Sequence, residues 1–143
     1  MPIPFWVGRY IGLPFKEQGR NRQGVDCWGL VRLIYAENFL VSLPSYTHAY
    51  PNTNASEILG ALVNREAKKW HAVEQGQEEL GDVVVLRMRG CPMHVGLVVG
   101  DRQMLHVQTG VNASLEHYQN MRWSNRIVGF YRHKEVENAT SEF

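Results

Sequence analysis

The chain has 143 residues, enough for one domain with its own hydrophobic core. Apolar residues make up 44% and charged residues 20%, a composition that excludes a wholly disordered chain. The formal net charge of +1 gives no reason to expect nucleic acid as a partner or insertion into a membrane, and no apolar run is long enough for a membrane span.

The first 70 residues predict helices and loops. A short helix is expected over residues 5–11, and Pro14 ends it. Its apolar side consists of Trp6, Val7, Tyr10 and Ile11. Residues 16–24 are polar, and glycines bracket their second half, so they predict a loop. Prolines and Arg9 interrupt the apolar N-terminal stretch, which therefore predicts no secretion signal.

Two further helices are predicted. Asp26 is a natural N-cap, apolar residues follow it at helical spacing, and Asn38 is a plausible helix end. The apolar positions of this second helix are Leu30, Val31, Ile34 and Tyr35. A third helix is expected to begin at Asn54 or Ser56, because Glu57 completes a capping box with Asn54. Its buried side would be Ile58, Leu59, Leu62 and Val63.

The stretch from about residue 82 to 132 predicts strands. The five expected strands cover residues 83–86, 94–99, 103–108, 111–115 and 127–132, the last one closing the sheet. Helices followed by strands favour an α+β fold with an antiparallel sheet of about five strands. We expect a single domain over residues 1–133 and a loose polar tail over residues 134–143.

Cys27 is the strongest candidate for chemistry. It directly follows the predicted N-cap, where the helix dipole and free backbone N–H groups favour a thiolate and could stabilise an oxyanion. A thiol nucleophile needs a base, and His94 and His106 lie on neighbouring predicted strands. In this interpretation His94 exchanges a proton with Cys27, and His106 orients the ring of His94.

The turn between the two strands decides whether these histidines share a face. If residues 100–102 form a three-residue turn, Val99 faces Gln103, and His106 lies opposite Gly96. Both rings then lie on one face, about 7–8 Å apart at their backbones. A two-residue turn would put them on opposite faces, because side chains alternate along a strand.

Other interpretations of these residues stay open. A cysteine inside a helix is often a small core residue, and a histidine in a strand is often merely half-buried. Cys91 and His94 also have zinc-ligand spacing, with His106 or His71 as further ligands, but the second pair is poorly spaced. We therefore expect no metal and no cofactor, and we interpret Cys91 as structural.

Four segments together resemble the NlpC-type cell-wall cysteine peptidases, a papain-like family. They are residues 24–31 around Cys27, residues 81–84, residues 93–98 around His94, and residues 105–107 around His106. The resemblance covers about residues 5–132 and implies a papain-like fold, with the nucleophile helix packed on an antiparallel sheet. It also implies hydrolysis of D-glutamyl–diaminopimelate amides in peptidoglycan stem peptides, with Cys27 as nucleophile, His94 as general base and acid, and His106 as orienting residue.

Further details resemble the members encoded by tailed bacteriophages and prophages. They are residues 11–15, the tryptophan after the cysteine, and residues 122–132. This resemblance implies a component of the virion tail tip, made in the host cytoplasm, that acts at the bacterial cell wall. Its partners would be the peptidoglycan stem peptide and other tail-tip or hub proteins.

Two positions depart from the pattern of many bacterial members. Phe15 stands where those members have a tyrosine, and Trp28 stands where they have a serine. With Asp26, these are the candidate substrate-binding residues, although Asp26 is also explained as a helix cap alone. The departures leave two alternatives: a structural tail-tip or tail-assembly component with a weak or silent site, or thiol-based acyl transfer or amidase chemistry.

Overall fold

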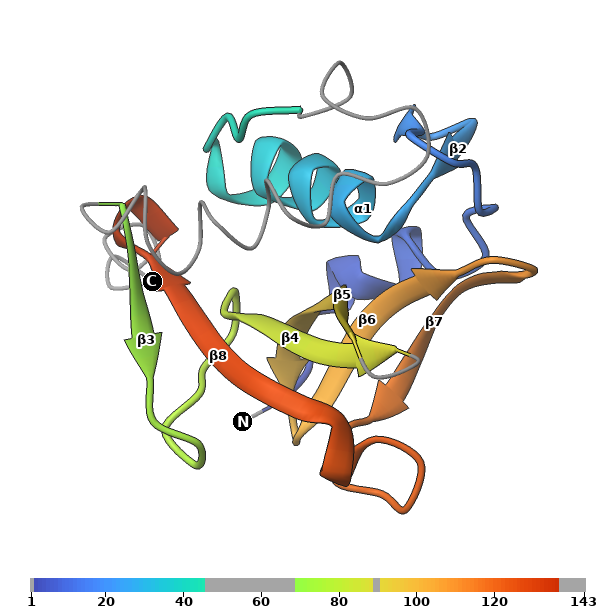
Figure 1. Cartoon of the computed structure of the whole chain (residues 1–143). Coiled ribbons are helices and arrows are strands. Elements are labelled where there is room, and N and C mark those ends of the chain that lie inside the picture. Colours follow the sequence, from blue (N-terminus) through green and yellow to red (C-terminus); the bar gives the residue numbers. More distant parts are fainter. Residues whose placement is uncertain (1, 46–68, 89–90, 137–143) are drawn as a thin grey trace.

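The computed structural model describes residues 2–45, 69–88 and 91–136. In this part of the chain one α-helix, α1 (Cys27–Ile34), lies over a six-stranded antiparallel sheet (Figure 1). The strand order is β3-β8-β4-β5-β6-β7. The strand bounds are β3 (Trp70–Val73), β4 (Val83–Met88), β5 (Cys91–Gly100), β6 (Gln103–Gln108), β7 (Val111–His117) and β8 (Ile127–His133). The predicted α+β class and the packing of the helix that starts at Cys27 on an antiparallel sheet are confirmed.

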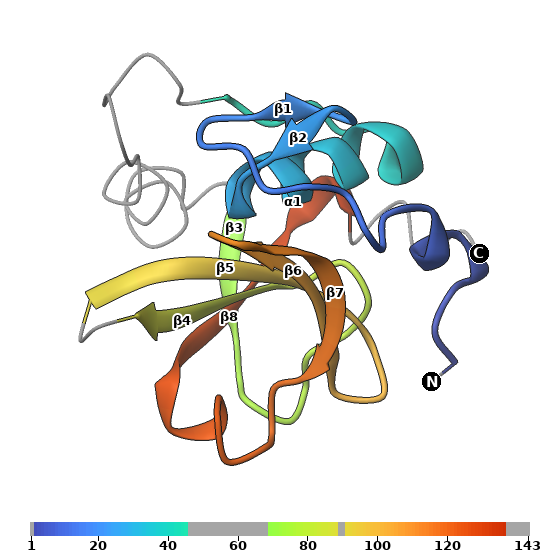
Figure 2. The same cartoon turned by 90° about the vertical axis from the view of Figure 1, so that its right-hand side faces the viewer.

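The N-terminal segment differs in detail from its prediction. The first helix is a short 3-10 helix, η1 (Phe5–Arg9), with Val7 buried, while Ile11 lies beyond its end and is 48% exposed. The predicted loop over residues 16–24 contains one strand of a small hairpin and the start of the other. These are β1 (Arg20–Asn21) and β2 (Gly24–Val25), which lie on the α1 side of the sheet (Figure 2).

Helix α1 begins as its sequence predicts. The side chain of Asp26 accepts a hydrogen bond of 2.7 Å from the backbone N–H of Gly29, so Asp26 is the N-cap. The chain continues as a π-helical turn, η2 (Tyr35–Phe39), and stops where Leu40 adopts the left-handed conformation, one residue beyond the π-helical turn. The third predicted helix lies outside the described residues.

The sheet contains one strand that the sequence pattern did not indicate. β3 is short, and buried and exposed side chains alternate little along it. It pairs with β8 at the edge of the sheet. β8 therefore lies between β3 and β4 rather than closing the sheet as expected. A second 3-10 helix, η4 (Ser124–Arg126), leads directly into β8.

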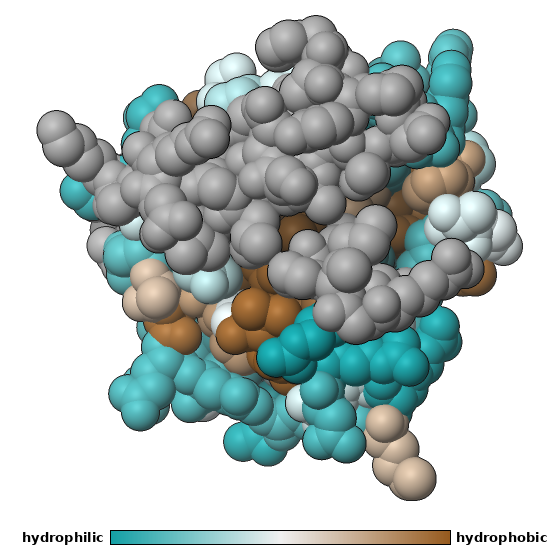
Figure 3. All heavy atoms as spheres, in the orientation of Figure 1, coloured by the Kyte–Doolittle hydropathy of each residue, from teal (hydrophilic) through white to brown (hydrophobic). Residues whose placement is uncertain are grey.

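Hydrophobic side chains fill both faces of the sheet. On one face, the main core includes residues of α1 together with Val95 and Leu97 of β5. The other face carries a smaller core cluster of Val84, Leu86, Val98, Met104, Tyr118, Trp123 and Phe130. On the molecular face of Figure 3, hydrophilic residues cover most of the lower rim. The α1 face and the Trp123 face are thus two distinct surroundings for side chains of β5 and β6.

The C-terminal boundary also differs from its prediction. A helical turn starts at Lys134, and Val136 is buried in the main core beside Gly81. The expected loose tail from residue 134 therefore does not begin there, because the core extends past residue 133. In the described ranges, no helix has the length and apolarity that crossing a bilayer would require.

Candidate active site

The predicted nucleophile, Cys27, is the first residue of α1 and is half-buried. Backbone N–H groups of Val95 and Trp28 face its sulfur, which places the sulfur beside strand β5. Burial is the main reason that the pKa of the thiol is raised to about 11, and the nearby charge of Asp26 adds to it. The two N–H groups and Arg20 lower the pKa only partly. The resting thiol therefore keeps its proton at neutral pH.

The Asp26 carboxylate at the start of the same helix is fully engaged. It accepts hydrogen bonds from the N–H of Gly29 at 2.7 Å, Nη1 of Arg20 at 2.7 Å and the N–H of Gln18 at 3.1 Å. These bonds tie the β1–β2 hairpin to the helix that carries Cys27. A substrate-binding role for Asp26 stays a prediction, and any substrate amine would compete with these donors.

The turn that positions the two histidines has two residues, not the three expected. Gly100 pairs with Gln103, while Asp101 and Arg102 form the turn with φ of 51° and 58°. A one-residue bulge at Val99 compensates, so Leu97 still faces Leu105 and Val98 still faces Met104. The bulge preserves the parity that the three-residue turn predicted.

His94 and His106 consequently share one face of the sheet. Nε2 of His94 and Nδ1 of His106 are 2.8 Å apart, a hydrogen bond between two buried rings. Gly96, between the two rings along β5, leaves room for the facing side chains of β6, since a Cβ there would lie 2.9 Å from Sδ of Met104 and 3.4 Å from the Cβ of His106. The buried indole of Trp123 stacks on His94 at an interplanar angle of 19° and meets His106 edge-on.

Burial keeps both imidazoles neutral. It is the main reason that the pKa of His94 is lowered to about 3, and the charges of His106 and Arg122 act in the same direction. Burial also lowers the pKa of His106, although the hydrogen bond and charge of Glu116 oppose it. With a protonated thiol, the resting pair of Cys27 and His94 is uncharged.

Glu116 is a site residue that the sequence interpretation missed. Its Oε1 lies 2.8 Å from Nε2 of His106, and its Oε2 accepts a hydrogen bond of 2.9 Å from Nε1 of Trp123. We call His94, His106 and Glu116 the histidine relay. Glu116 lies in β7 beyond the predicted strand end, and a bulge between His106 and Gln108 brings it to the face of His106. The signal was a carboxylate one diagonal step from His106, visible only once that bulge is known.

The described contacts connect Cys27 to the relay through the backbone of β5. Cys27 packs against the main core, whereas His94 stacks on Trp123 in the cluster of the other face. The sulfur faces the N–H of Val95, the residue after His94, and the described contacts include no hydrogen bond between the sulfur and the His94 ring. Nδ1 of His94 is the ring nitrogen that the relay does not use.

The other two predicted substrate-binding residues lie near α1. Trp28 is buried, donates a hydrogen bond of 2.8 Å to the carbonyl of Pro44, and packs on Trp70. Phe15 is partly buried against the main core and forms an isolated bridge with Val25. These contacts describe structural roles, and substrate contacts by either residue stay predictions.

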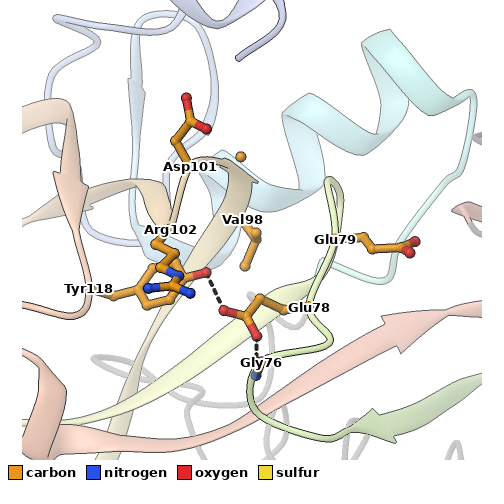
Figure 4. A pocket seen from close by; sticks show the side chains of 8 residues that line it. Gly76, Glu78, Glu79, Val98, Asp101, Arg102 and Tyr118 are labelled. Atoms are coloured by element: carbon orange, nitrogen blue, oxygen red, sulfur yellow. Dashed lines mark hydrogen bonds between the residues drawn. The ribbon is translucent and has the colours of Figure 1, made fainter. Parts of the chain in front are cut away.

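Other polar groups of the described residues lie apart from the relay. No three His, Cys, Asp or Glu side chains among them are arranged to hold a metal ion. A hollow of about 260 Å³ shares no lining residue with the relay or Cys27 (Figure 4). Its Glu78 accepts hydrogen bonds of 2.6 Å from the Tyr118 hydroxyl and from the N–H of Gly76, so these groups brace two loops.

Comparison with known proteins gives consistent results. Residues 12–132 match the family model described as NlpC/P60 family. The chain is 24% identical over 115 residues to the murein DD-endopeptidase MepS/murein LD-carboxypeptidase of Escherichia coli (strain K12), covering 80% of this chain and 53% of that protein. It is 25% identical over 116 residues to a probable endopeptidase NlpC homolog of Haemophilus influenzae, covering 80% and 52%. The chain thus spans about half the length of these curated relatives.

Solved structures show the same fold. An NlpC/P60 family protein from Bacillus cereus ATCC 10987 superposes with a TM-score of 0.66 at 18% identity, covering 92% of this chain and 41% of that one. The NlpC/p60 domain of the peptidoglycan hydrolase SagA superposes with a TM-score of 0.58 at 20% identity, covering 88% and 92%. The papain-like fold expected from the sequence is confirmed.

Proposed function

The chain belongs to the NlpC/P60 family, and we propose that it is a cysteine peptidase that hydrolyses an amide bond in peptidoglycan stem peptides. The observation that carries this proposal is the hydrogen-bonded pair of His94 and His106, 2.8 Å apart, beside the strand residue whose N–H faces the Cys27 sulfur. The names of relatives support the same substrate, since they include murein endopeptidases and a peptidoglycan hydrolase.

The reaction begins from an uncharged pair. Nδ1 of His94 takes the thiol proton as the Cys27 sulfur attacks the amide carbonyl carbon, which places the imidazole against the sulfur in the substrate complex. The carbonyl oxygen becomes an oxyanion beside the N-terminal N–H groups of α1. His94 then gives the proton to the departing amine as the C–N bond breaks and an acyl-enzyme thioester remains. Water then gives a proton to His94 as it attacks the thioester carbonyl, the C–S bond breaks, the acid product leaves, and His94 passes that proton to the Cys27 sulfur.

The test is fragment release from purified peptidoglycan, followed by mass spectrometry. The wild-type chain should release stem-peptide fragments, and Cys27→Ala should release none while its thermal unfolding stays close to that of the wild type. Cys91→Ser is the matched control, since it removes the other cysteine, and it should keep its activity. Undiminished release by the Cys27→Ala chain would overturn the cysteine mechanism.

The bond we propose is the one between D-glutamate and diaminopimelate. Support comes from the sequence resemblance to NlpC-type peptidases at Cys27, His94 and His106. The masses of released fragments identify the cleaved bond, because cleavage before diaminopimelate leaves a new amino terminus on that residue. Fragments cut elsewhere in the stem would contradict this assignment while leaving a peptidase in place.

We further propose that the chain is carried on a bacteriophage or prophage tail tip. Support comes from the resemblance of residues 11–15, Trp28 and residues 122–132 to tail-associated members. Particles purified through a density gradient should contain the protein at a fixed ratio to tail protein, and its absence from them would contradict this location. If the chain is a purely structural tail component, virions with Cys27→Ala should penetrate the wall as well as the wild type. If it is a working peptidase, those virions should penetrate less well.

A further inference from the structure

We infer that Glu116 and Trp123 fix the order of protons in the histidine relay, so that the lone pair of His94 lies at Nδ1. This inference deepens the proposed function, since a base with its lone pair at the wrong nitrogen cannot take the thiol proton. Glu116 is a positioning residue in this scheme, because it acts on His94 only through His106.

The carboxylate of Glu116 fixes which nitrogen of His106 carries the proton. Burial acts to raise the pKa of Glu116, but the hydrogen bonds from Trp123 and His106 and the charge of Arg122 outweigh it, so the pKa of Glu116 is lowered and the group is ionised at neutral pH. An ionised carboxylate only accepts hydrogen bonds. Nε2 of His106, 2.8 Å from Oε1 of Glu116, must therefore carry a proton.

The tautomer of His106 in turn determines the tautomer of His94. Burial keeps His106 neutral, so its single ring proton is the one at Nε2, and its Nδ1 holds a lone pair. Nε2 of His94, 2.8 Å away, must donate to that lone pair. Because His94 is also neutral, its own lone pair is left at Nδ1, the nitrogen that the mechanism needs.

The reverse order is excluded by charge and geometry. It would turn a lone pair on Nε2 of His106 toward the Glu116 carboxylate, and it would put a proton on Nδ1 of His94. Among the described residues, the other charged or titratable groups around the relay include Arg122, with Nη1 3.7 Å from Oε2 of Glu116, Arg126 over the Trp123 ring, and Cys27 beside β5. An arginine only donates, and the Cys27 sulfur faces N–H groups of Val95 and Trp28, so none of the three offers Nε2 of His106 a competing acceptor.

Trp123 makes a carboxylate-to-amide substitution unusually informative. An indole N–H only donates, so in Glu116→Gln it holds the amide oxygen, as it holds Oε2 of Glu116 at 2.9 Å in the native chain. The amide NH₂ then faces Nε2 of His106, which must accept, and the whole proton order reverses. Catalysis slows when the base of a triad has the wrong tautomer, and it slows when the outer residue that binds the triad is lost. We therefore expect kcat of Glu116→Gln to fall about 100-fold or more with little change in KM.

Two variants control this experiment. Glu78→Gln makes the same chemical change in a carboxylate that also accepts two hydrogen bonds, from Tyr118 and Gly76, and it should keep the wild-type kcat. Adding Trp123→Phe to Glu116→Gln removes the indole donor and lets the amide turn its oxygen to His106. This double variant should be about tenfold more active than Glu116→Gln alone. A double variant with no gain would overturn the role of Trp123, and Glu116→Gln with wild-type kcat would overturn that of Glu116.

Nitrogen NMR of ¹⁵N-histidine-labelled wild-type chain reads the proton order directly at neutral pH. The expected spectrum has protonated Nε2 and unprotonated Nδ1 in both His94 and His106, and protonated Nδ1 in either ring would overturn the inference. This measurement needs no substrate and no variant, so a misfolded variant leaves it decisive. If the expected order is found but the wild type cleaves no peptidoglycan, the proposed function fails and the proton order stands.

Discussion

Two carboxylates, Asp82 just before β4 and Glu116 in β7, lie at similar distances from their hydrogen-bond partners, but the partners differ in kind. Both oxygens of Asp82 bind the guanidinium of Arg132, at 2.8 and 2.9 Å, and the N–H of Glu79 adds a third bond. Glu116 instead has a neutral imidazole and an indole within hydrogen-bond distance, and its guanidinium neighbour, Arg122, lies farther away, with Nη1 3.7 Å from Oε2. Arginine never releases its proton in a protein, so the Asp82 pair is static, whereas an imidazole can accept and release one. The Asp82–Arg132 ion pair is therefore a static brace, whereas Glu116 belongs to a relay whose imidazoles can exchange protons.

The largest difference between the two networks should be in the rate of catalysis. His94→Gln removes the proposed base while keeping a polar side chain, and kcat should fall about 10³-fold or more with the fold retained. The measurement is peptidoglycan turnover with circular dichroism on the same sample. Arg132→Met, assayed where it is folded, should keep most of its kcat, and a large loss there would contradict the division into brace and relay.

The reverse holds for stability. Arg132→Met leaves the buried Asp82 carboxylate without its cation and should lower the free energy of unfolding by about 3–5 kcal/mol. Burial then raises the pKa of Asp82 further, so the loss should shrink as the pH falls and the carboxyl group takes up a proton. Urea titrations across acidic pH measure both effects. A deficit that does not change with pH would show that lost packing by Arg132, rather than the unpaired charge, causes it.

Acid should destabilise the relay. The pKa of His94 is lowered from its ordinary 6.5 to about 3, so the unfolded chain binds a proton more readily than the folded chain. The stability from this group is complete above pH 6.5 and is lost as the pH falls toward about 3, a decrease of a few (~3–5) kcal/mol in the free energy of unfolding. His94→Gln should flatten the curve in this range, and an equally steep curve in that variant would assign the acid sensitivity to other groups.

The smallest effect is expected at the β5–β6 turn, which neither carboxylate contacts in the described structure. Arg102 adopts φ of 58°, a conformation that glycine adopts without steric cost. Arg102→Gly should raise the free energy of unfolding by about 0.5 kcal/mol, after loss of an exposed hydrogen bond to Gln119. The kcat should not change. A changed kcat would show that the turn affects the relay by more than its register.

The sequence predicted the start of α1 and the histidine pair because both follow local rules. Asp26 has the chemistry of an N-cap, and alternation along the strands placed His94 and His106 on one face. The turn itself was wrong by one residue, and the bulge at Val99 compensated for it. Such compensation is invisible in a sequence, since the choice between a longer turn and a bulge depends on how β5 twists against β4 and β6.

The features that the sequence analysis did not predict depend on bulges or on long-range packing. Glu116 joins the relay only because a second bulge shifts β7 by one residue, and β3 exists as a strand because the edge of β8 offers it hydrogen bonds. Val136 is isolated in a polar segment, yet it fills the space beside Gly81. Each depends on a partner more than 50 residues away, or on a bulge, and no local pattern encodes either.

A sulfur that keeps its proton is a poor target for oxidants, because peroxide and disulfide exchange both consume the ionised form. Burial at the start of α1 raises the pKa of Cys27 to about 11, so little of it is ionised in neutral surroundings. Under the proposed mechanism, the same burial protects the nucleophile from oxidation while no substrate is bound, because the thiol ionises only when an acyl substrate is in place and the imidazole takes its proton.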